Sequence, residues 1–132
     1  MILVILFAFL LGVPAVPEII GLPAKTKDVE ITIIWHEPQN NGASITQYTV
    51  YQRTVSDDGT PRKWYTLYVI KDPTDRKVAV KLEKGKHYEF LVTATNRFGE
   101  SLKKGEKIKR IVVLGGKCMI IVLFTKKNGH AM

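Results

Sequence analysis

Residues 35–48 read WHEPQNNGASITQY, and this stretch separates two runs of alternating apolar residues. The first run ends at Trp35, and the second has begun by Tyr48. Between them lie Pro38 and the pair Asn41–Gly42. Proline removes a backbone donor, and Asn and Gly adopt the positive φ angles of tight turns. The stretch therefore predicts a turn between two strands of one core, with Trp35 buried, and not a loop that carries out catalysis.

The same period of two recurs along the rest of the chain, in short segments about 8–12 residues apart, as in all-β sandwiches and barrels. Turn-forming sequences such as SDDGTPR, EKGK and NRFGES separate these segments. A register slip between Ile45 and Tyr48 predicts a small bulge at that point. An edge strand is predicted between Pro17 and Pro23. The other segments predicted as strands are Val29–Trp35, Ile45–Val50, Trp64–Ile70, Val78–Leu82, Tyr88–Asn96 and Ile108–Leu114.

Two longer patterns resemble those of fibronectin type III domains. Because the resemblance covers about Val16 to Leu114, it implies one immunoglobulin-like, seven-stranded antiparallel sandwich. Departures such as Ala43 and Lys84, where the family often has Gly and Pro, fall in loops. The first pattern consists of Trp35, Pro38, Asn41, Gly42, Ile45 and Tyr48, and the second of Leu82, Tyr88, Phe90, Val92, Ala94, Asn96, Gly99 and Ser101.

The resemblance also implies structural roles for these residues. Tyr88 corresponds to the tyrosine corner, in which the phenol bonds to a backbone group a few residues upstream. The turn residues are expected to be Pro38, Asn41, Gly42 and Gly99. The core is expected to contain Trp35, Tyr48, Leu82, Tyr88, Phe90 and Val92.

The two ends of the chain differ from the predicted sandwich. No charged side chain occurs in the first seventeen residues, and Ile2–Leu11 is apolar but shorter than the roughly 20 residues of a membrane span. Residues 1–15 are therefore predicted to be a signal peptide cleaved after Ala15, although no Lys or Arg precedes the apolar run. The alternatives are an apolar N-terminal strand and a truncated start. Residues 115–132 stay unassigned, and the apolar run Cys118–Phe124 predicts no membrane span.

No pattern of catalytic or metal-binding residues is found in the sequence. His36, His87 and His130 lack metal-ligand spacing, and one cysteine cannot complete a zinc site. Nucleophile-elbow, phosphate-loop and HExxH motifs are absent. The segment Asp57–Gly59 is predicted to be a hairpin turn, with a weak calcium site as the alternative. We therefore expect a protein that is not an enzyme and that needs no cofactor or metal.

The chain is basic, with 20 Lys and Arg against 12 Asp and Glu. A short segment on the predicted last strand concentrates this charge. Lysines on an edge strand prevent edge-to-edge pairing, and this explains the segment without a ligand. The alternative is weak binding of a sulfated polysaccharide; nucleic acid is not expected. The candidate anion-binding residues are Lys103, Lys104, Lys107, Lys109 and Arg110.

The resemblance implies a non-enzymatic protein-interaction module of an extracellular or cell-surface adhesion or receptor protein, in which this chain is one piece. Such domains also occur as spacers in large intracellular filament proteins, and that is the alternative function. A cleaved leader would place the domain outside the cytoplasm. Tyr51 is predicted to face outward from its strand, as aromatic residues at interfaces do, but the sequence identifies neither the protein partner nor the binding face.

Overall fold

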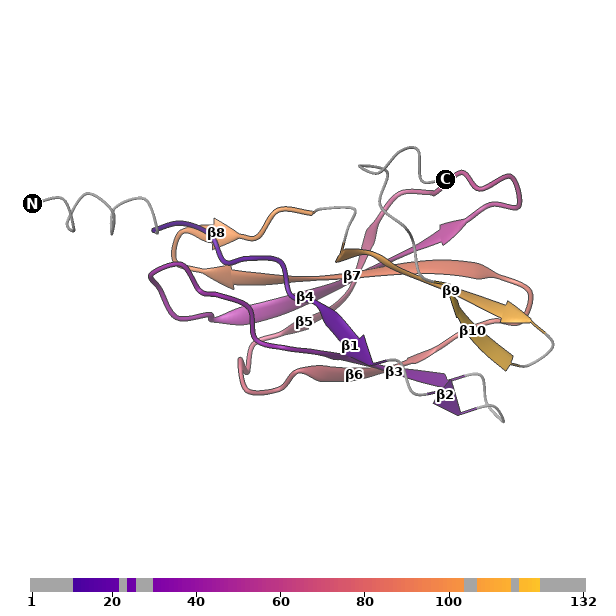
Figure 1. The fold of residues 1–132 in the computed structure, drawn as a ribbon, viewed down its shortest axis with the longest axis horizontal. Coiled ribbons are helices and arrows are strands. Elements are labelled where there is room, and N and C mark those ends of the chain that lie inside the picture. Colours follow the sequence, from indigo (N-terminus) through magenta and orange to yellow (C-terminus); the bar gives the residue numbers. More distant parts are fainter. Residues whose placement is uncertain (1–10, 22–23, 26–29, 104–106, 115–116, 122–132) are drawn as a thin grey trace, which may run out of the picture.

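A computed structural model of the chain describes residues 11–21, 24–25, 30–103, 107–114 and 117–121 (Figure 1). Within these residues the protein is built from antiparallel strands without an α-helix. No helix in the described part is long and apolar enough to cross a membrane. The strands are β1 (Ile19–Gly21), β2 (Ala24–Lys25), β3 (Glu30–Trp35), β4 (Gln47–Val55), β5 (Tyr65–Ile70), β6 (Lys77–Lys81), β7 (His87–Asn96), β8 (Gly99–Glu100), β9 (Lys109–Leu114) and β10 (Lys117–Ile121).

The strands form two sheets that enclose one core. In the smaller sheet β3 lies between β6 on one side and the short strands β1 and β2 on the other. The larger sheet has the order β10-β9-β7-β4-β5, and β8 also pairs with β7. The predicted all-β sandwich is confirmed. Among the described residues, β1, β3, β4, β5, β6, β7 and β9 correspond to the seven predicted strands, and the short strands β2 and β8 and the strand β10 are additional.

The core follows directly from the period of two. Successive side chains of a strand point to opposite faces, so every second residue enters the space between the sheets. Trp35 of β3 and Tyr48 of β4 meet there edge to face, with ring centroids 5.4 Å apart. Tyr88 stacks on Phe90 with centroids 6.1 Å apart. The buried cluster includes Trp35, Tyr48, Leu82, Tyr88, Phe90 and Val92 together with residues of both sheets such as Ile31, Ile33, Val50 and Ile111.

Two local predictions differ from the structure. The register shift lies between Val50 and Tyr51 in the pairing of β4 with β5, because Val50 faces Tyr68 whereas Tyr51 faces Thr66. Ile45 and Tyr48 are both buried in the core, as the predicted slip requires, but Ile45 precedes β4, so the slip is not a bulge within the strand. The last predicted strand is also not at an edge, because β10 pairs along β9 over five residues. Edge protection therefore does not explain the basic residues of β9.

Candidate interaction surfaces

The loop between β3 and β4 binds the N-terminal segment. The backbone N–H of Gly12 donates to the carbonyl of Asn41 at 3.0 Å, and the N–H of Ala15 donates to the carbonyl of Gln39 at 3.0 Å. In return, Nδ2 of Asn41 donates to the carbonyl of Val13 at 2.9 Å. Asn41 has a φ of 54°, in the left-handed region that Asn tolerates better than most residues. The predicted turn thus also holds residues 12–15.

Asn96 connects this segment to the end of β7. Its Nδ2 donates to the carbonyl of Gly12 at 2.9 Å and to the carbonyl of Asn40 at 2.8 Å. Its Oδ1 accepts a hydrogen bond from the N–H of Phe98 at 2.8 Å. One buried amide therefore joins the N-terminal segment, the β3–β4 loop and the turn before Gly99, which has a φ of 132°.

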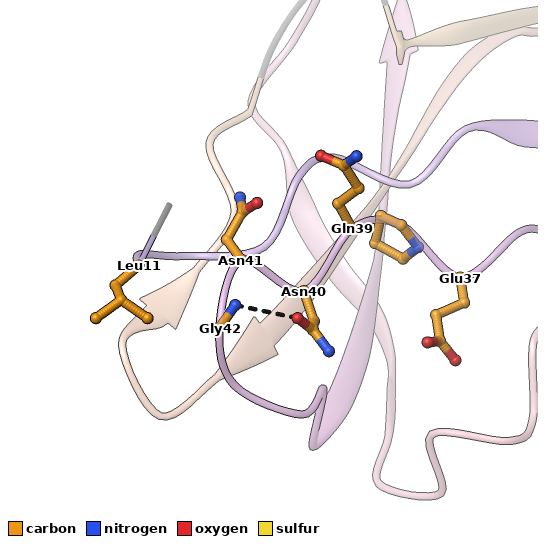
Figure 2. A pocket seen from close by; sticks show the side chains of 7 residues that line it. Leu11, Glu37, Gln39, Asn40, Asn41 and Gly42 are labelled. Atoms are coloured by element: carbon orange, nitrogen blue, oxygen red, sulfur yellow. Dashed lines mark hydrogen bonds between the residues drawn. The ribbon is translucent and has the colours of Figure 1, made fainter. Parts of the chain in front are cut away.

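A hollow of about 480 Å³ lies beside this loop (Figure 2). Leu11 and Gly42 lie on one side of it, and Glu37 lies on the other. The N–H of Gly42 donates to Oδ1 of Asn40 at 3.1 Å, and Pro38 lies in the same loop. Gly42 has a φ of 103°, and an added Cβ there would overlap Leu11. Amide groups and a single carboxylate suit a contact surface for a polar partner better than acid–base chemistry.

The segment Asp57–Gly59 forms a turn between β4 and β5. Oδ1 of Asp58 accepts hydrogen bonds from the hydroxyl of Ser56 at 2.6 Å and from the N–H of Thr60 at 2.9 Å. These bonds lower the pKa of Asp58 from 3.8 to about 2. Gly59 supplies a φ of 89°. The carboxylate therefore has partners within its own turn, and no group of three metal-ligating side chains occurs among the described residues.

Four of the five candidate anion-binding residues lie in the part of the chain that the structure describes. Nζ of Lys103 lies 4.3 Å from the ring centre of Tyr51. Nζ of Lys107 lies 3.8 Å from the Glu18 carboxylate. Arg110 pairs with a buried carboxylate, Lys109 is half-buried on β9, and Lys104 lies outside the described residues. Three of the five cations thus contact different groups of the same chain, and binding of a sulfated polysaccharide stays a prediction from the sequence.

The buried carboxylate belongs to Glu89, which sequence reasoning missed. Glu89 lies on β7 between Arg53 of β4 and Arg110 of β9, opposite both in the strand register. Arg53 Nη2 lies 2.7 Å from one carboxylate oxygen, and Arg110 Nη2 lies 2.8 Å from the other. The Arg53 guanidinium also lies 4.1 Å from the ring centre of Trp64. Its sequence signal is that Glu89 is the one Asp, Glu, Lys or Arg residue within β7, and this signal does not identify the two arginines until the strand register is known.

Tyr51 does face outward, but it is covered. It is 9% exposed, under Lys103 and beside Glu100, which accepts a hydrogen bond from the phenol. Burial, followed by this bond and the repulsion of the carboxylate, raises the pKa of Tyr51 from 10.0 to about 12. The sequence-based interpretation of Tyr51 as an exposed interface residue is therefore wrong. Large exposed apolar side chains occur instead on β5, at Tyr65, Tyr68 and Val69.

Tyr88 holds the start of β7 to the segment before it. Its phenol oxygen accepts a hydrogen bond from the N–H of Glu83 at 2.9 Å, five residues upstream. Burial raises the pKa of Tyr88. Leu82, 7% exposed, joins the same core. These contacts are structural, because they lie within the sandwich and leave the phenol inaccessible to a partner.

The chain was compared with family models, curated proteins and solved structures. No family model matches the chain. The Drosophila melanogaster cell adhesion molecule Dscam1 is 34% identical over 106 residues, which cover 76% of this chain and 5% of that protein. The chain thus spans about one-twentieth of the length of the curated relative it matches.

Solved structures share the sandwich at lower sequence identity. The twitchin kinase region of C. elegans superposes with a TM-score of 0.60 at 23% identity, over 80% of this chain and 18% of that one. The fourth fibronectin type III domain of a human protein superposes with a TM-score of 0.54 at 21% identity, over 84% of this chain and 77% of that one. A titin structure with the kinase and its flanking domains superposes with a TM-score of 0.54 at 24% identity, over 69% of this chain and 16% of that one.

Proposed function

We propose that this chain, which has the fold of a fibronectin type III domain, is a non-enzymatic interaction module of an extracellular or cell-surface adhesion protein. The observation that carries the proposal is the 34% identity over 106 residues with a cell adhesion molecule. The titin and twitchin structures have lower identity, at 24% and 23%, and they support the fold alone. Because the chain corresponds to 5% of the adhesion molecule, we assign it a contact surface and not the whole adhesive activity.

Two features of the surface support a role in binding. The loop at 37–42 presents amide groups and one carboxylate around an open hollow. Strand β5 presents Tyr65, Tyr68 and Val69, each at least 42% exposed. Aromatic residues are enriched at protein–protein interfaces because they bury a large area with few rotatable bonds. When residues 1–15 are removed, the loop at 37–42 retains the bond from Asn96 to the carbonyl of Asn40 and the bond from the N–H of Gly42 to the Asn40 side chain, so part of its shape stays fixed for a partner.

The alternative is a spacer repeat in an intracellular filament-associated protein, and the fate of the N-terminus distinguishes the two. We propose that residues 1–15 direct secretion and are cleaved after Ala15. The test is expression of the whole chain in secretory cells, followed by N-terminal sequencing of protein from the medium and from the cytosol. A product in the medium that begins at Val16 supports the extracellular module.

The matched control replaces the small residue that signal peptidase requires, in the variant Ala15→Arg. This variant should retain its leader and stay associated with the secretory membranes. Wild-type protein that remains in the cytosol with Met1 intact would contradict the extracellular location and favour the spacer.

A further inference from the structure

Strand β5 forms one open edge of the larger sheet. In the described part it pairs with β4 and with no other strand. An edge strand leaves alternate N–H and C=O groups without a partner, and proteins usually guard such edges with charges or proline. The residues of β5, YTLYVI, contain neither. By contrast β6, at the edge of the other sheet, begins with Lys77 and ends with Lys81.

The β5 edge is exposed and apolar. Tyr65 is 50% exposed, Val69 is 48% exposed and Tyr68 is 42% exposed. The hydroxyl of Tyr68 donates to the carbonyl of Ala79 at 3.2 Å, which fixes this side of β5 against β6. This bond ties β5 to β6, while Tyr65, Tyr68 and Val69 stay exposed.

The bulge of β5 makes this edge able to pair with its own copy. In an antiparallel pair, facing residues either both form hydrogen bonds across the pair or both do not. Thr66 and Val69 are three positions apart, so in a regular strand their backbone N–H and C=O groups would point to opposite edges of the strand. Here they face Tyr51 and Thr49, which are two positions apart on β4. The extra residue Leu67 therefore places Thr66 and Val69 in equivalent positions.

The same equivalence holds for the neighbours of these residues. Tyr65 and Ile70 face Gln52 and Tyr48, which are four positions apart on β4. A second copy of β5 in antiparallel orientation can therefore place its Val69 opposite Thr66 and its Ile70 opposite Tyr65. The two bulges then face each other at the centre, with a short ladder on each side. Facing pairs of aromatic and β-branched residues, such as Tyr65 with Ile70, stabilise paired strands.

The charged residues that flank β5 favour this register of the two copies over a register shifted by one residue. Continued past both ends of β5, it places Lys63 of each copy opposite Asp72 of the other, and Trp64 opposite Lys71. Lys63, Lys71 and Asp72 are all exposed. Opposite charges facing each other on paired strands attract, and like charges repel. A shift by one residue would place Lys63 opposite Lys71 instead.

We propose that β5 is a homophilic contact strand, through which two copies of this chain join their larger sheets edge to edge in an antiparallel pair with Thr66 opposite Val69. The proposal goes beyond the function proposed above, because it depends on β5 alone and holds for a secreted or an intracellular protein. Edge pairing supplies main-chain hydrogen bonds, and the flanking charges supply the register. The contact is small, so we expect a dimer that dissociates on dilution.

The first test is disulfide trapping in the full chain, with Cys118→Ser as the background. Facing residues of an antiparallel pair have Cα atoms about 4.5–5.5 Å apart, within the range that a disulfide bridges. Thr66 and its own copy would be offset by the two ladder positions that separate Tyr51 from Thr49, about 7 Å along the strands. Together with about 4.8 Å between strands, this puts their Cα atoms about 8 Å apart, outside that range. Oxidation of a mixture of Thr66→Cys and Val69→Cys proteins should therefore give a cross-linked dimer, and either protein alone should give none.

The second test measures mass against concentration by sedimentation equilibrium. The average mass of the wild-type protein should rise from 14.9 kDa towards twice that value as the concentration increases. Val69→Lys should remove this rise, because it puts a charge into the contact. Ile20→Lys is the matched control, since Ile20 is also 48% exposed but lies on β1 of the other sheet, and it should dimerise as wild type does.

Three outcomes would overturn the proposal. They are a constant mass of 14.9 kDa at every concentration, a dimer that Val69→Lys leaves intact, and cross-linking of Thr66→Cys with itself as strong as in the mixture. Near-UV circular dichroism, which reports on the Trp35–Tyr48 packing, checks that each variant is folded.

Discussion

Glu89 shows how far a single side chain depends on residues distant in the sequence. It lies on the outward face of β7, between Tyr88 and Phe90, which both point into the core. An outward carboxylate is normally in water, but the Glu89 side chain is 3% exposed because Arg53 and Arg110 cover it. Removing a carboxylate from water costs several kcal/mol, which paired guanidinium groups offset when the geometry is good. The two arginines therefore make the burial of Glu89 tolerable.

We predict that Glu89→Gln lowers the free energy of unfolding by about 3 kcal/mol, because it leaves two guanidinium groups side by side without their carboxylate. Urea denaturation at pH 7 measures the change. Arg53→Met is the comparison. It leaves the carboxylate paired with Arg110, so it should lower the free energy of unfolding by a smaller amount. Equal stability of Glu89→Gln and wild type would show that the cluster contributes nothing to folding.

Tyr51 gives the protein a stability that depends on pH. Its folded-state pKa of about 12 lies above the value of 10.0 for a free phenol, so the folded state favours the neutral form. This contribution is complete below pH 10 and is lost as the pH rises from 10 through 12. We predict that Tyr51→Phe makes the decline of stability over this range less steep, measured by urea denaturation at several pH values. Burial also raises the pKa of Tyr48 and of Tyr88, so part of the decline should remain.

At the scale of elements, the segment Leu11–Val16 is integrated with two loops. Gly12 and Ala15 donate backbone hydrogen bonds to the β3–β4 loop, and the carbonyl groups of Gly12 and Val13 accept from Asn96 and Asn41. Cleavage after Ala15 would remove these carbonyl groups. Both amide side chains would then need water in place of a fixed partner.

We predict that protein beginning at Val16 is less stable than protein beginning at Leu11, by about 1 kcal/mol for each hydrogen bond lost from a partly buried group. Thermal and urea unfolding of the two forms measures the difference. Asn41→Ala should destabilise the form that begins at Leu11 more than the form that begins at Val16, because one of its bonds exists in the longer form alone. Identical stability of the two forms would mean that the segment contributes nothing to the fold.

For the whole molecule, the two proposed roles can fail independently. The proposed secretion depends on residues 1–15, and the proposed self-association depends on the outer edge of β5. A cytosolic protein that still dimerises through β5 would retain the contact strand and lose the extracellular role. A secreted monomer would retain the role of the module and lose the second copy as its partner, which would direct attention to the loop at 37–42.

The sandwich could be predicted from the sequence, because the signals for it are local. Alternation of apolar residues fixes which face of each strand is buried, and Pro, Asn and Gly fix the turns, as at 38–42. Trp35, Tyr48, Tyr88 and Phe90 could be placed in a core without knowing which strands are neighbours. The turn at Asp57–Gly59 followed in the same way from its residue types.

The residues that meet across strands could not be predicted, because their contacts depend on how the strands are ordered in space. Arg53, Glu89 and Arg110 are far apart in the chain and come together only when β4, β7 and β9 are aligned in register. The covering of Tyr51, the pairing of β10 along β9 and the bulge at Leu67 also depend on strand order. The alternation of apolar residues indicates which face of a strand each side chain is on. It does not indicate which strand is the neighbour or which residues cover that face.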